Sequence, residues 1–338
     1  MPSKNVPAEP IELPQEFIQD QTSIIAEQSV PSCPVCKSEM FTLYALGYDY
    51  ELRTCANQWK FVKCDACEHV WLNPRPAISE LATIYPPHYY AYNYDKQVNP
   101  IALRGKEILD KFKFNSILSH LNQPPRSFLD VGCGNGRFLK LMERIGLERE
   151  QIYGIELDEQ VIAKLKMQGY KAFDQRVEDI QDIPAESIDL ATMFHVIEHV
   201  DDPGQVVEKT AAWLRPGGLF AIETPNIDSI DAELFQQSYW GGYHIPRHWN
   251  LFKESTLRKL LQDRGLEVVT VNYQTGHSFW MYSIHHYLRY KRGWRTAAKW
   301  FDPLKGLPAL VGFTAFDKLR GSLGQKTSAM LMLARKPG

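Results

Sequence analysis

The chain has 338 residues and a formal net charge of −2, with 44% hydrophobic and 23% charged residues. This length accommodates one full α/β domain and a smaller domain beside it. The near-neutral charge, without a long basic run, argues against a dedicated nucleic-acid-binding surface. No apolar run reaches the roughly 18–20 residues that a membrane-spanning helix needs, so we expect a cytoplasmic protein.

The first thirty residues are rich in Pro, Glu, Gln and Ser. They lack the basic segment followed by an apolar segment that marks a signal peptide. We therefore expect residues 1–30 to form a loose, disordered tail.

Four cysteines follow in two pairs, Cys33-x-x-Cys36 and Cys64-x-x-Cys67. Each pair places two thiolates on one turn, and two such turns supply the tetrahedral sulfur set that zinc prefers. Because four thiolates fill the coordination shell, we expect a structural zinc ribbon over residues 31–76. The alternatives are disulfides, which a reducing cytoplasm disfavours, or four buried thiols, and His69 is a rival ligand.

Residues 77–125 are predicted to connect the ribbon to a second domain. They begin with an aromatic segment, Tyr85-Pro-Pro-His-Tyr-Tyr-Ala-Tyr-Asn-Tyr94, in which the prolines disfavour a helix. An amphipathic helix over 102–121 is predicted to pack on the second domain. Tyr90 and its neighbours have two interpretations: an aromatic face over a cationic ligand, or a hinge that packs the ribbon on the core.

From Ser127 onward, predicted strands and helices alternate. We expect strands over 127–131, 152–156, 170–173, 188–194, 218–223, 266–273 and 328–334, and helices over 136–146, 159–168, 203–214 and 254–264. This alternation predicts an α/β fold with a mostly parallel, doubly wound, Rossmann-like sheet. The last two strands fit an antiparallel edge pair, interrupted by an insertion over 277–325.

The first strand of this domain runs into a glycine loop, Phe128-Leu-Asp-Val-Gly-Cys-Gly-Asn-Gly136. Gly132, Gly134 and Gly136 permit positive φ and a close approach of backbone to a ligand. The helix that follows offers free N–H groups to an anion. We interpret this as a nucleotide-type pocket, although the spacing differs from the G-x-G-x-x-G dinucleotide motif.

Acidic residues end or follow the next two strands. Glu156 ends the second strand, where an acid accepts hydrogen bonds from ribose hydroxyls in doubly wound folds. Asp158 is the alternative ribose contact, or it caps the helix beginning near residue 159. Asp179 or Glu178 is placed to contact a base edge, and the competing interpretation is a solvated turn.

Histidines cluster in two further segments. The fourth strand runs into His195-Val-Ile-Glu-His199, and polar groups at the carboxyl end of such a strand face the ligand crevice. His244 and His248 flank Ile245-Pro246 in a later segment. Each of these histidines has a structural alternative, namely holding a loop by a hydrogen bond.

Four motifs in this order resemble those of class I S-adenosylmethionine-dependent methyltransferases, over roughly residues 126–338. They are Asp130-Val-Gly-Cys-Gly-Asn-Gly136, Gly154-Ile-Glu156, the Ile188-to-Pro203 block, and Leu214-Arg-Pro-Gly-Gly218. The chain is further similar to bacterial members with an N-terminal zinc ribbon, through Asn73-Pro-Arg-Pro76, Glu223-Thr-Pro-Asn226 and His244-to-Phe252. Many of those members are linked to sugar, cell-surface glycan or specialised-metabolite pathways.

The resemblance implies S-adenosylmethionine as cofactor and a seven-stranded sheet with an antiparallel last strand. It implies that the glycine loop packs against the methionine end and that further contacts come from Asp130 (ammonium), Glu156 (ribose), and Phe194 and His195 (sulfonium). From the residues themselves we also expect Asp179 at the adenine and Tyr90 over the cofactor. One departure affects the adenine contact: many relatives carry Gly-Asp where this chain has Gln175-Arg176.

Methyl transfer depends mainly on alignment of acceptor, methyl and sulfur, but a sugar hydroxyl also needs a base. We expect His199 or His244 in that role, ahead of His195 and His248. The expected acceptor is a small hydroxylated molecule, such as a lipid- or nucleotide-linked sugar, a glycan precursor or a specialised metabolite, methylated on oxygen. The alternatives are C- or N-methylation of a nucleotide-linked sugar, or a non-catalytic cofactor-binding scaffold.

The insertion over 277–325 mixes aromatic and basic residues with an apolar piece from Leu304 to Phe316. Three interpretations stay open: a lid over the acceptor site, a dimer surface, or contact with a membrane surface. The last would place the protein at the periphery of the inner membrane.

Overall fold

The computed structural model describes residues 11–86 and 100–338, with side chains in the first helix after the gap described from Ile108 onward. The chain divides into two compact units, each assembled from three segments. The ribbon unit comprises Met1–Asn93, Pro225–Leu257 and Tyr273–Met330, and the sheet unit comprises Tyr94–Thr224, Arg258–Asn272 and Leu331–Gly338.

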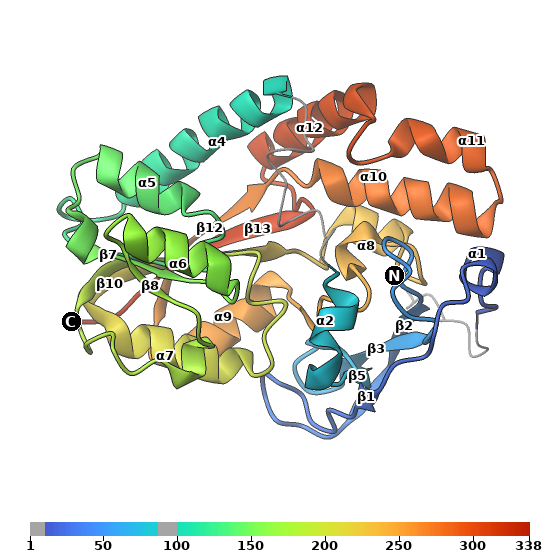
Figure 1. Ribbon diagram of the computed structural model, residues 1–338, viewed down its shortest axis with the longest axis horizontal. Coiled ribbons are helices and arrows are strands. Elements are labelled where there is room, and N and C mark those ends of the chain that lie inside the picture. Colours follow the sequence, from blue (N-terminus) through green and yellow to red (C-terminus); the bar gives the residue numbers. More distant parts are fainter. Residues whose placement is uncertain (1–10, 87–99) are drawn as a thin grey trace. The chain divides into compact units, whose positions relative to one another are not determined.

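A seven-stranded sheet organises the sheet unit (Figure 1). Its strand order is β12-β13-β10-β9-β6-β7-β8. The bounds are β6 Phe128–Val131, β7 Ile152–Ile155, β8 Lys171–Phe173, β9 Ile188–Phe194, β10 Leu214–Pro225, β12 Glu267–Gln274 and β13 Ala329–Arg335. Strands β10, β9, β6, β7 and β8 run parallel to their neighbours.

Strand β13 is the antiparallel member of this sheet. The Gly217 N–H donates to the Lys336 carbonyl (2.8 Å), and the Lys336 N–H donates back to the Gly218 carbonyl (3.0 Å). Lys336 thus exchanges its two backbone bonds with two adjacent residues of β10, which is the antiparallel pattern with one extra residue, a bulge. The predicted doubly wound sheet with an antiparallel last strand is therefore confirmed.

Helices cover both faces of the sheet. Figure 1 shows α4 (Pro100–Leu118) and α5 (Arg137–Arg144) on one side and α7 (Pro203–Trp213) on the other. The remaining predicted helices are α6 (Glu159–Met167) and α9 (Glu254–Gln262). Asp158 accepts hydrogen bonds from the second and third N–H groups of α6, so its capping role is the one that the structure bears out.

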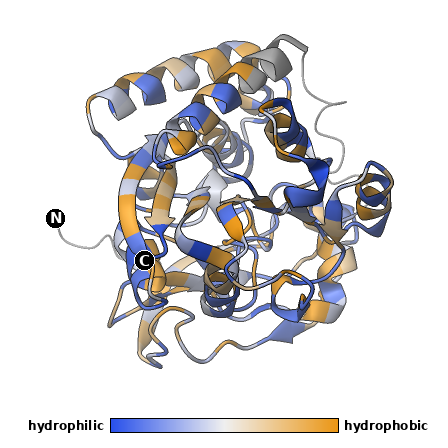
Figure 2. Ribbon diagram, turned by 90° about the vertical axis from the view of Figure 1, so that its left-hand side faces the viewer, coloured by the Kyte–Doolittle hydropathy of each residue, from blue (hydrophilic) through white to orange (hydrophobic). Residues whose placement is uncertain are grey.

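The core of the sheet unit lies between the strands and α4, α5 and α6. It contains Phe114 and Ile117 from α4, together with Leu139, Met142, Ile162 and Leu165 from the next two helices. Parallel strands covered on both faces read as continuous apolar runs, which is why these strands were recognisable. Figure 2 shows hydrophilic and hydrophobic residues alternating along the helices, as expected where each helix buries one face.

The ribbon unit contains an antiparallel sheet in the order β11-β4-β3-β2. Its strands are β2 Phe41–Gly47, β3 Trp59–Cys64, β4 Val70–Leu72 and β11 Asn250–Leu251. The last of these comes from far along the chain, and Asn250 pairs with Trp71. The core accordingly mixes ribbon residues such as Trp59 and Phe61 with Trp240 and Trp249 from the later segment.

The insertion is helical. It contains α10 (His277–His286), a π-helical turn (Tyr287–Lys291), α11 (Arg295–Ala298) and α12 (Leu307–Ser322). The short helices α2 (Leu81–Ile84) and α8 (Ile230–Leu234) lie in the same unit. Among residues 11–86 and 100–338, no helix combines the length and apolar character needed to cross a bilayer.

Residues 11–30 differ from the predicted loose tail. They contain α1 (Gln15–Gln19) and β1 (Glu27–Gln28), which pairs with β5 (Arg75–Pro76). The physical reason is Phe17, which is 1% exposed and packs on Tyr48 with ring centroids 5.7 Å apart. The prediction used the average composition of residues 1–30, and an average does not reveal one aromatic side chain that is buried. The predicted domain boundaries at 31–76, 77–125 and 126–338 stay predictions.

Candidate active site and metal centre

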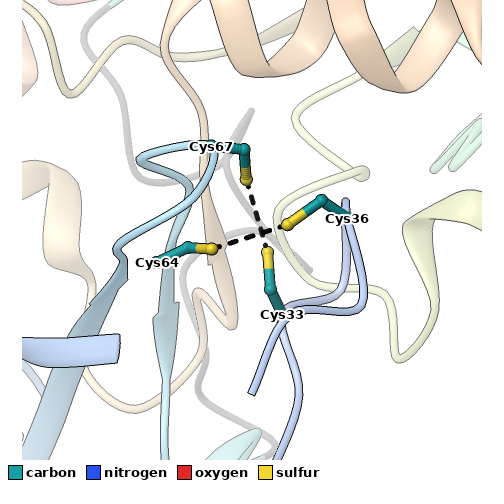
Figure 3. Close-up of side chains that lie close together, drawn as sticks. All are labelled: Cys33, Cys36, Cys64 and Cys67. Carbon is teal, nitrogen blue, oxygen red and sulfur yellow. Dashed lines mark hydrogen bonds between the residues drawn. The ribbon is translucent and has the colours of Figure 1, made fainter. Parts of the chain in front are cut away.

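The four cysteine sulfurs of the ribbon unit converge on one point (Figure 3). Cys33 and Cys67 sulfurs lie 3.6 Å apart, and Cys36 and Cys64 sulfurs lie 3.5 Å apart. Zinc–sulfur bonds of about 2.3 Å imply a tetrahedral edge of about 3.8 Å, so the spacing fits a zinc ion. A disulfide requires about 2.05 Å, and all six cysteines are free thiols.

Two matching turns hold these sulfurs. In each, the residue after the second cysteine, Lys37 or Glu68, adopts left-handed backbone (φ 62° and 63°). Its N–H donates to the carbonyl of the first cysteine of its pair, Cys33 or Cys64. The repeated geometry aims both thiols of a pair to the same side. The residues therefore fit a closed, four-sulfur structural zinc site.

His69 does not join the sulfur cluster. Its ring is fully buried near the rings of Trp71 and Phe252, and Nε2 lies 3.3 Å from Asn250 Oδ1. Burial lowers the pKa of His69 to about 4, partly opposed by the bond to Asn250. This histidine is a neutral packing residue.

The glycine loop follows β6 in the sheet unit. Gly132, Gly134 and Gly136 all have positive φ, at 75°, 47° and 72°. A Cβ at Gly132 would lie 2.3 Å from Val196, and one at Gly136 would lie 2.5 Å from Leu165. A Cβ at Gly134 would have no neighbour within 4 Å. Two of the glycines therefore allow close packing, while the middle one faces open space where a ligand can approach.

Asp130, the last residue but one of β6, has one carboxylate oxygen without a hydrogen-bond partner among the described residues. Its Oδ1 accepts a hydrogen bond from Thr192 Oγ1 (2.7 Å), while Oδ2 is buried without a partner among the described residues. Burial raises the pKa of Asp130 to about 7, with a further contribution from the Glu156 charge, against the bond from Thr192. A buried acceptor that lacks a partner fits the ammonium group of the implied cofactor.

Glu156 follows β7 and turns back to the glycine loop. Its carboxylate accepts from the Gly134 N–H (3.1 Å) and from the Leu157 N–H (2.8 Å). A carboxylate has about four lone-pair positions, so two remain for ribose hydroxyls. Glu156 is half-buried, and its position beside Gly134 brings two of the predicted cofactor residues together.

The predicted adenine contact is less constrained. Asp179 is exposed at the end of a short turn (Val177–Asp179), and Glu178 pairs with Arg176 at 3.0 Å. Phe194 ends β9 and packs on Phe138 with ring centroids 5.4 Å apart. Tyr90 lies outside the described residues.

His195 lies within a group of four charged side chains. Its Nδ1 is 3.3 Å from Glu198 Oε1, and its Nε2 is 3.5 Å from Glu223 Oε1. Glu223 also forms an ion pair with Lys113 of α4, and Glu198 accepts from Thr224 Oγ1 (3.0 Å). His195 itself has left-handed backbone (φ 56°), and its N–H donates to the Glu223 carbonyl.

The charges of this group determine what His195 does near neutral pH. Desolvation lowers the pKa of His195, but the bonds to Glu198 and Glu223 outweigh it and raise the pKa to about 9. Burial raises the pKa of Glu223, but Lys113 and His195 lower it to about 2. His195 is therefore a cation near pH 7, which suits it less to accepting a proton. His199 ends the following turn, where its N–H donates to the Val196 carbonyl.

His244 and His248 belong to the ribbon unit. His244 Nδ1 donates to Glu51 Oε2 at 2.9 Å, and both side chains are 5% exposed. His248 Nδ1 donates to the Gly242 carbonyl (2.8 Å), and the two histidine rings lie 4.9 Å apart. His244 is thus hydrogen-bonded to a carboxylate, whereas His248 is hydrogen-bonded to a backbone carbonyl.

A small cavity adjoins His244. Its lining includes Tyr50, Glu51, Ser238, Trp240 and His286, and its volume is about that of one water molecule. Tyr50 Oη lies 2.7 Å from Ser238 Oγ. Burial, together with the nearby His285, lowers the pKa of His286 well below its ordinary value, so this ring is neutral.

A second side-chain pair joins the same two loops as His244 and Glu51. Arg247 and Asp49 form a fully buried bidentate ion pair, with nitrogen–oxygen distances of 3.1 and 3.0 Å. The Arg247 Nε also donates to the Ile84 carbonyl (2.7 Å). Asp49 and Glu51 share one loop after β2, and His244 and Arg247 share another. Both loops are thus joined twice.

Comparison with known proteins adds three kinds of match. A "SAM dependent methyltransferase" structure from Archaeoglobus fulgidus matches with TM-score 0.44 and 17% identity, over 70% of this chain and 100% of that chain. A "Ubiquinone biosynthesis O-methyltransferase" from Xanthomonas axonopodis pv. citri is 26% identical over 177 residues, 48% of this chain and 72% of the relative. A protein of that name from Xanthomonas oryzae pv. oryzae is 30% identical over 124 residues, 35% of this chain and about half of its own length, 51%.

The family model described as "Methyltransferase domain" matches residues 101–271, which is half of the chain. The chain belongs to the S-adenosylmethionine-dependent methyltransferases. The matched range contains the glycine loop, Asp130, Glu156 and the His195 group. The predicted family and enzyme class are confirmed, whereas the individual residue roles stay predictions.

Several residues near these sites in this methyltransferase were not predicted from the sequence. Lys113 lies on a helix where a lysine has no distinguishing pattern, so no signal could have linked it to Glu223. Asp49 and Glu51 stand in the run Tyr48-Asp-Tyr-Glu51, directly after a ribbon strand. Two acids among tyrosines at a strand end are a usable signal, because such acids are rarely buried without a cationic or imidazole partner.

Proposed function

We propose that this methyltransferase transfers the methyl group of S-adenosylmethionine to oxygen of a small hydroxylated acceptor, such as a sugar, a glycan precursor or a specialised metabolite. Two curated relatives carry the name O-methyltransferase, which supports oxygen as the acceptor atom. The resemblance to ribbon-bearing bacterial members supports the sugar or metabolite class.

The observation that carries this proposal is the buried His244–Glu51 pair. A hydroxyl group loses its proton during methylation and needs a base whose pKa lies near the working pH. Glu51 accepts a hydrogen bond from the Nδ1–H of His244, which fixes the tautomer in which Nε2 is the basic ring atom. The same carboxylate stabilises the imidazolium that forms when Nε2 takes the acceptor proton.

Cofactor binding is a separate part of the proposal, and it rests on residues of the sheet unit alone. Asp130 is the residue for the ammonium group, Glu156 for the ribose, and the open side of Gly134 for the methionine end. The cofactor brings an activated methyl group on sulfonium. The chain contributes binding and alignment, which account for most of the rate enhancement in a displacement of this kind.

We further propose that Cys33, Cys36, Cys64 and Cys67 hold one structural zinc ion. The closed sulfur set supports this role, since a catalytic zinc keeps an open position.

The test measures formation of S-adenosylhomocysteine with a panel of nucleotide-linked sugars and hydroxylated metabolites. With an accepted substrate, Glu51→Gln and His244→Asn should each lower kcat by about 10²–10⁴-fold while the Kd for S-adenosylmethionine stays unchanged. His120→Asn, on a surface helix end, is the matched control and should retain wild-type turnover.

Three other outcomes would overturn the proposal. A wild-type kcat in both variants would show that another residue is the base. Methyl transfer to carbon or nitrogen acceptors alone would favour the C- or N-methyltransferase alternative. Cofactor binding without turnover on the whole panel would favour a scaffold.

A further inference from the structure

Helix α12 (Leu307–Ser322) buries a charged pair on its inward side. Its buried residues include Asp317 and Arg320, whose side chains are 0% and 6% exposed and lie 3.5 Å apart. Asp317 also accepts hydrogen bonds from the Gly276 N–H (2.8 Å) and Trp280 Nε1 (3.3 Å). The charged residues thus serve the interior of the ribbon unit.

The exposed half of the same helix is almost entirely apolar. Val311, Leu319 and Leu323, just past the helix end, are 57%, 61% and 68% exposed. At 100° per residue, one continuous half of the helix surface carries Leu307, Pro308, Val311, Gly312, Ala315, Phe316, Leu319 and Leu323, interrupted only by Lys318 and Ser322. An exposed apolar patch of this kind marks an interaction surface.

The segment that leads into this helix is basic and aromatic. Residues 287–325 contain eight Lys or Arg and two Asp, a net charge of +6 in a chain whose overall charge is −2. Glu16, from outside this range, pairs with Arg289 and Arg295. Lys291, Arg292, Lys299 and Lys305 are exposed, whereas Asp317 is buried and Asp302 is partly covered. Trp294 and Trp300 are also exposed, and tryptophan favours the boundary between lipid headgroups and acyl chains.

We propose that the exposed face of α12, together with the exposed lysine, arginine and tryptophan residues that precede it in the chain, docks on the surface of an anionic lipid bilayer. The apolar half-helix enters the headgroup boundary, while the lysine and arginine side chains contact the lipid phosphates. A second copy of the chain fits this face less well, because a symmetric pairing would bring the two basic segments together. The inference is independent of the acceptor and of the proposed base.

Co-sedimentation of the intact protein with vesicles tests the proposal. The wild-type protein should bind phosphatidylcholine vesicles that contain phosphatidylglycerol, bind pure phosphatidylcholine vesicles more weakly, and dissociate from the anionic vesicles as salt rises. Val311→Glu with Leu319→Glu should weaken binding by more than about tenfold. Lys299→Glu with Lys305→Glu should remove most of the difference between the two kinds of vesicle.

The matched control is Ile145→Glu with Met167→Glu, which changes two exposed apolar residues of the sheet unit and should leave vesicle binding as in the wild type. Near-ultraviolet circular dichroism of the buried tryptophans of the ribbon unit, together with cofactor affinity, reports correct folding of every variant. Two results would overturn the proposal: folded wild-type protein that ignores anionic vesicles, or light scattering that shows a dimer split by the Val311 and Leu319 changes without any vesicle binding.

Discussion

Asp130 and Glu223 are both buried at carboxyl ends of strands in one sheet, yet their pKa values move in opposite directions. Burial raises that of Asp130 to about 7 because no cation among the described residues compensates it. Burial acts on Glu223 as well, but Lys113 and His195 lower its pKa to about 2. The charge of Glu223 is therefore balanced within the protein, whereas that of Asp130 is available to a cationic ligand.

This difference predicts how cofactor affinity depends on pH. Binding of an ammonium group favours ionised Asp130, so the Kd for S-adenosylmethionine should fall as pH rises through about 7. Asp130→Asn should raise the Kd at pH 8 by about tenfold to a hundredfold, the equivalent of one lost charge-assisted hydrogen bond, and should flatten the pH dependence. Calorimetric titration between pH 6 and 8 measures both.

The control for this titration is Asp182→Asn, which removes an exposed carboxylate from a loop of the same unit. It should retain the wild-type pH dependence. An unchanged slope in Asp130→Asn would assign the proton to another group.

At the scale of elements, two loops of the ribbon unit are held together by paired side chains. Arg247–Asp49 and His244–Glu51 join the loop after β2 to the segment before β11. The ion pair is fully buried, and loss of one partner would leave an uncompensated charge in the interior. If His244 is the base, this ion pair holds the two loops that carry it and Glu51.

Single and double substitutions distinguish this pair from ordinary packing. Arg247→Met or Asp49→Leu alone should lower the free energy of unfolding by about 3–5 kcal/mol, and the double variant should lose less than the sum. Urea unfolding followed by tryptophan fluorescence gives these values. Additive losses would show that the two charges do not depend on one another.

The two cysteine turns also join separate elements of the ribbon unit. They join the chain around Cys33 and Cys36 to the β3–β4 hairpin, which carries Cys64 and Cys67. Binding of a structural zinc ion contributes about 10–16 kcal/mol in small zinc domains, which is as large as the whole stability of an ordinary domain, about 5–15 kcal/mol. Zinc and the fold of the ribbon sheet should therefore be lost together.

Cys67→Ser, or prolonged chelation of the wild type, should abolish the zinc content of about one ion per chain and the near-ultraviolet circular dichroism of the buried Trp59 and Trp71. Cys55→Ala is the control, since Cys55 is buried beside Trp59 and outside the sulfur cluster. It should keep the metal. Retention of the tryptophan signal in a metal-free Cys67→Ser protein would show that the sheet forms without zinc.

At the scale of the whole molecule, the ribbon unit is discontinuous in sequence. Strand β11 extends the ribbon sheet, and Trp240, Tyr243, Trp249 and Leu251 share a core with Trp59 and Phe61. The N-terminal ribbon is thus one part of a larger folded unit. The later segments depend on it for covering their apolar side chains.

Deletion of residues 1–76 should consequently expose these side chains and cause aggregation, even though the matched methyltransferase range starts at residue 101. Solubility and analytical size exclusion of residues 77–338 test this expectation. A monomeric, cofactor-binding fragment would show that residues 225–257 and 273–330 fold without the ribbon.

Local pattern in the sequence was enough for the alternating strands and helices, the glycine loop, the two cysteine pairs and the methyltransferase family. Each of these depends on residues close together in the chain, where periodicity, φ preference and ligand spacing act directly. Tertiary structure alone decided that Glu51 meets His244, that Lys113 meets Glu223, that β11 joins the ribbon, and that α12 turns its apolar half outward. These contacts join residues up to 193 positions apart, and no local preference of either partner specifies them. They arise only when folding brings distant segments together to satisfy buried charge and cover apolar surface.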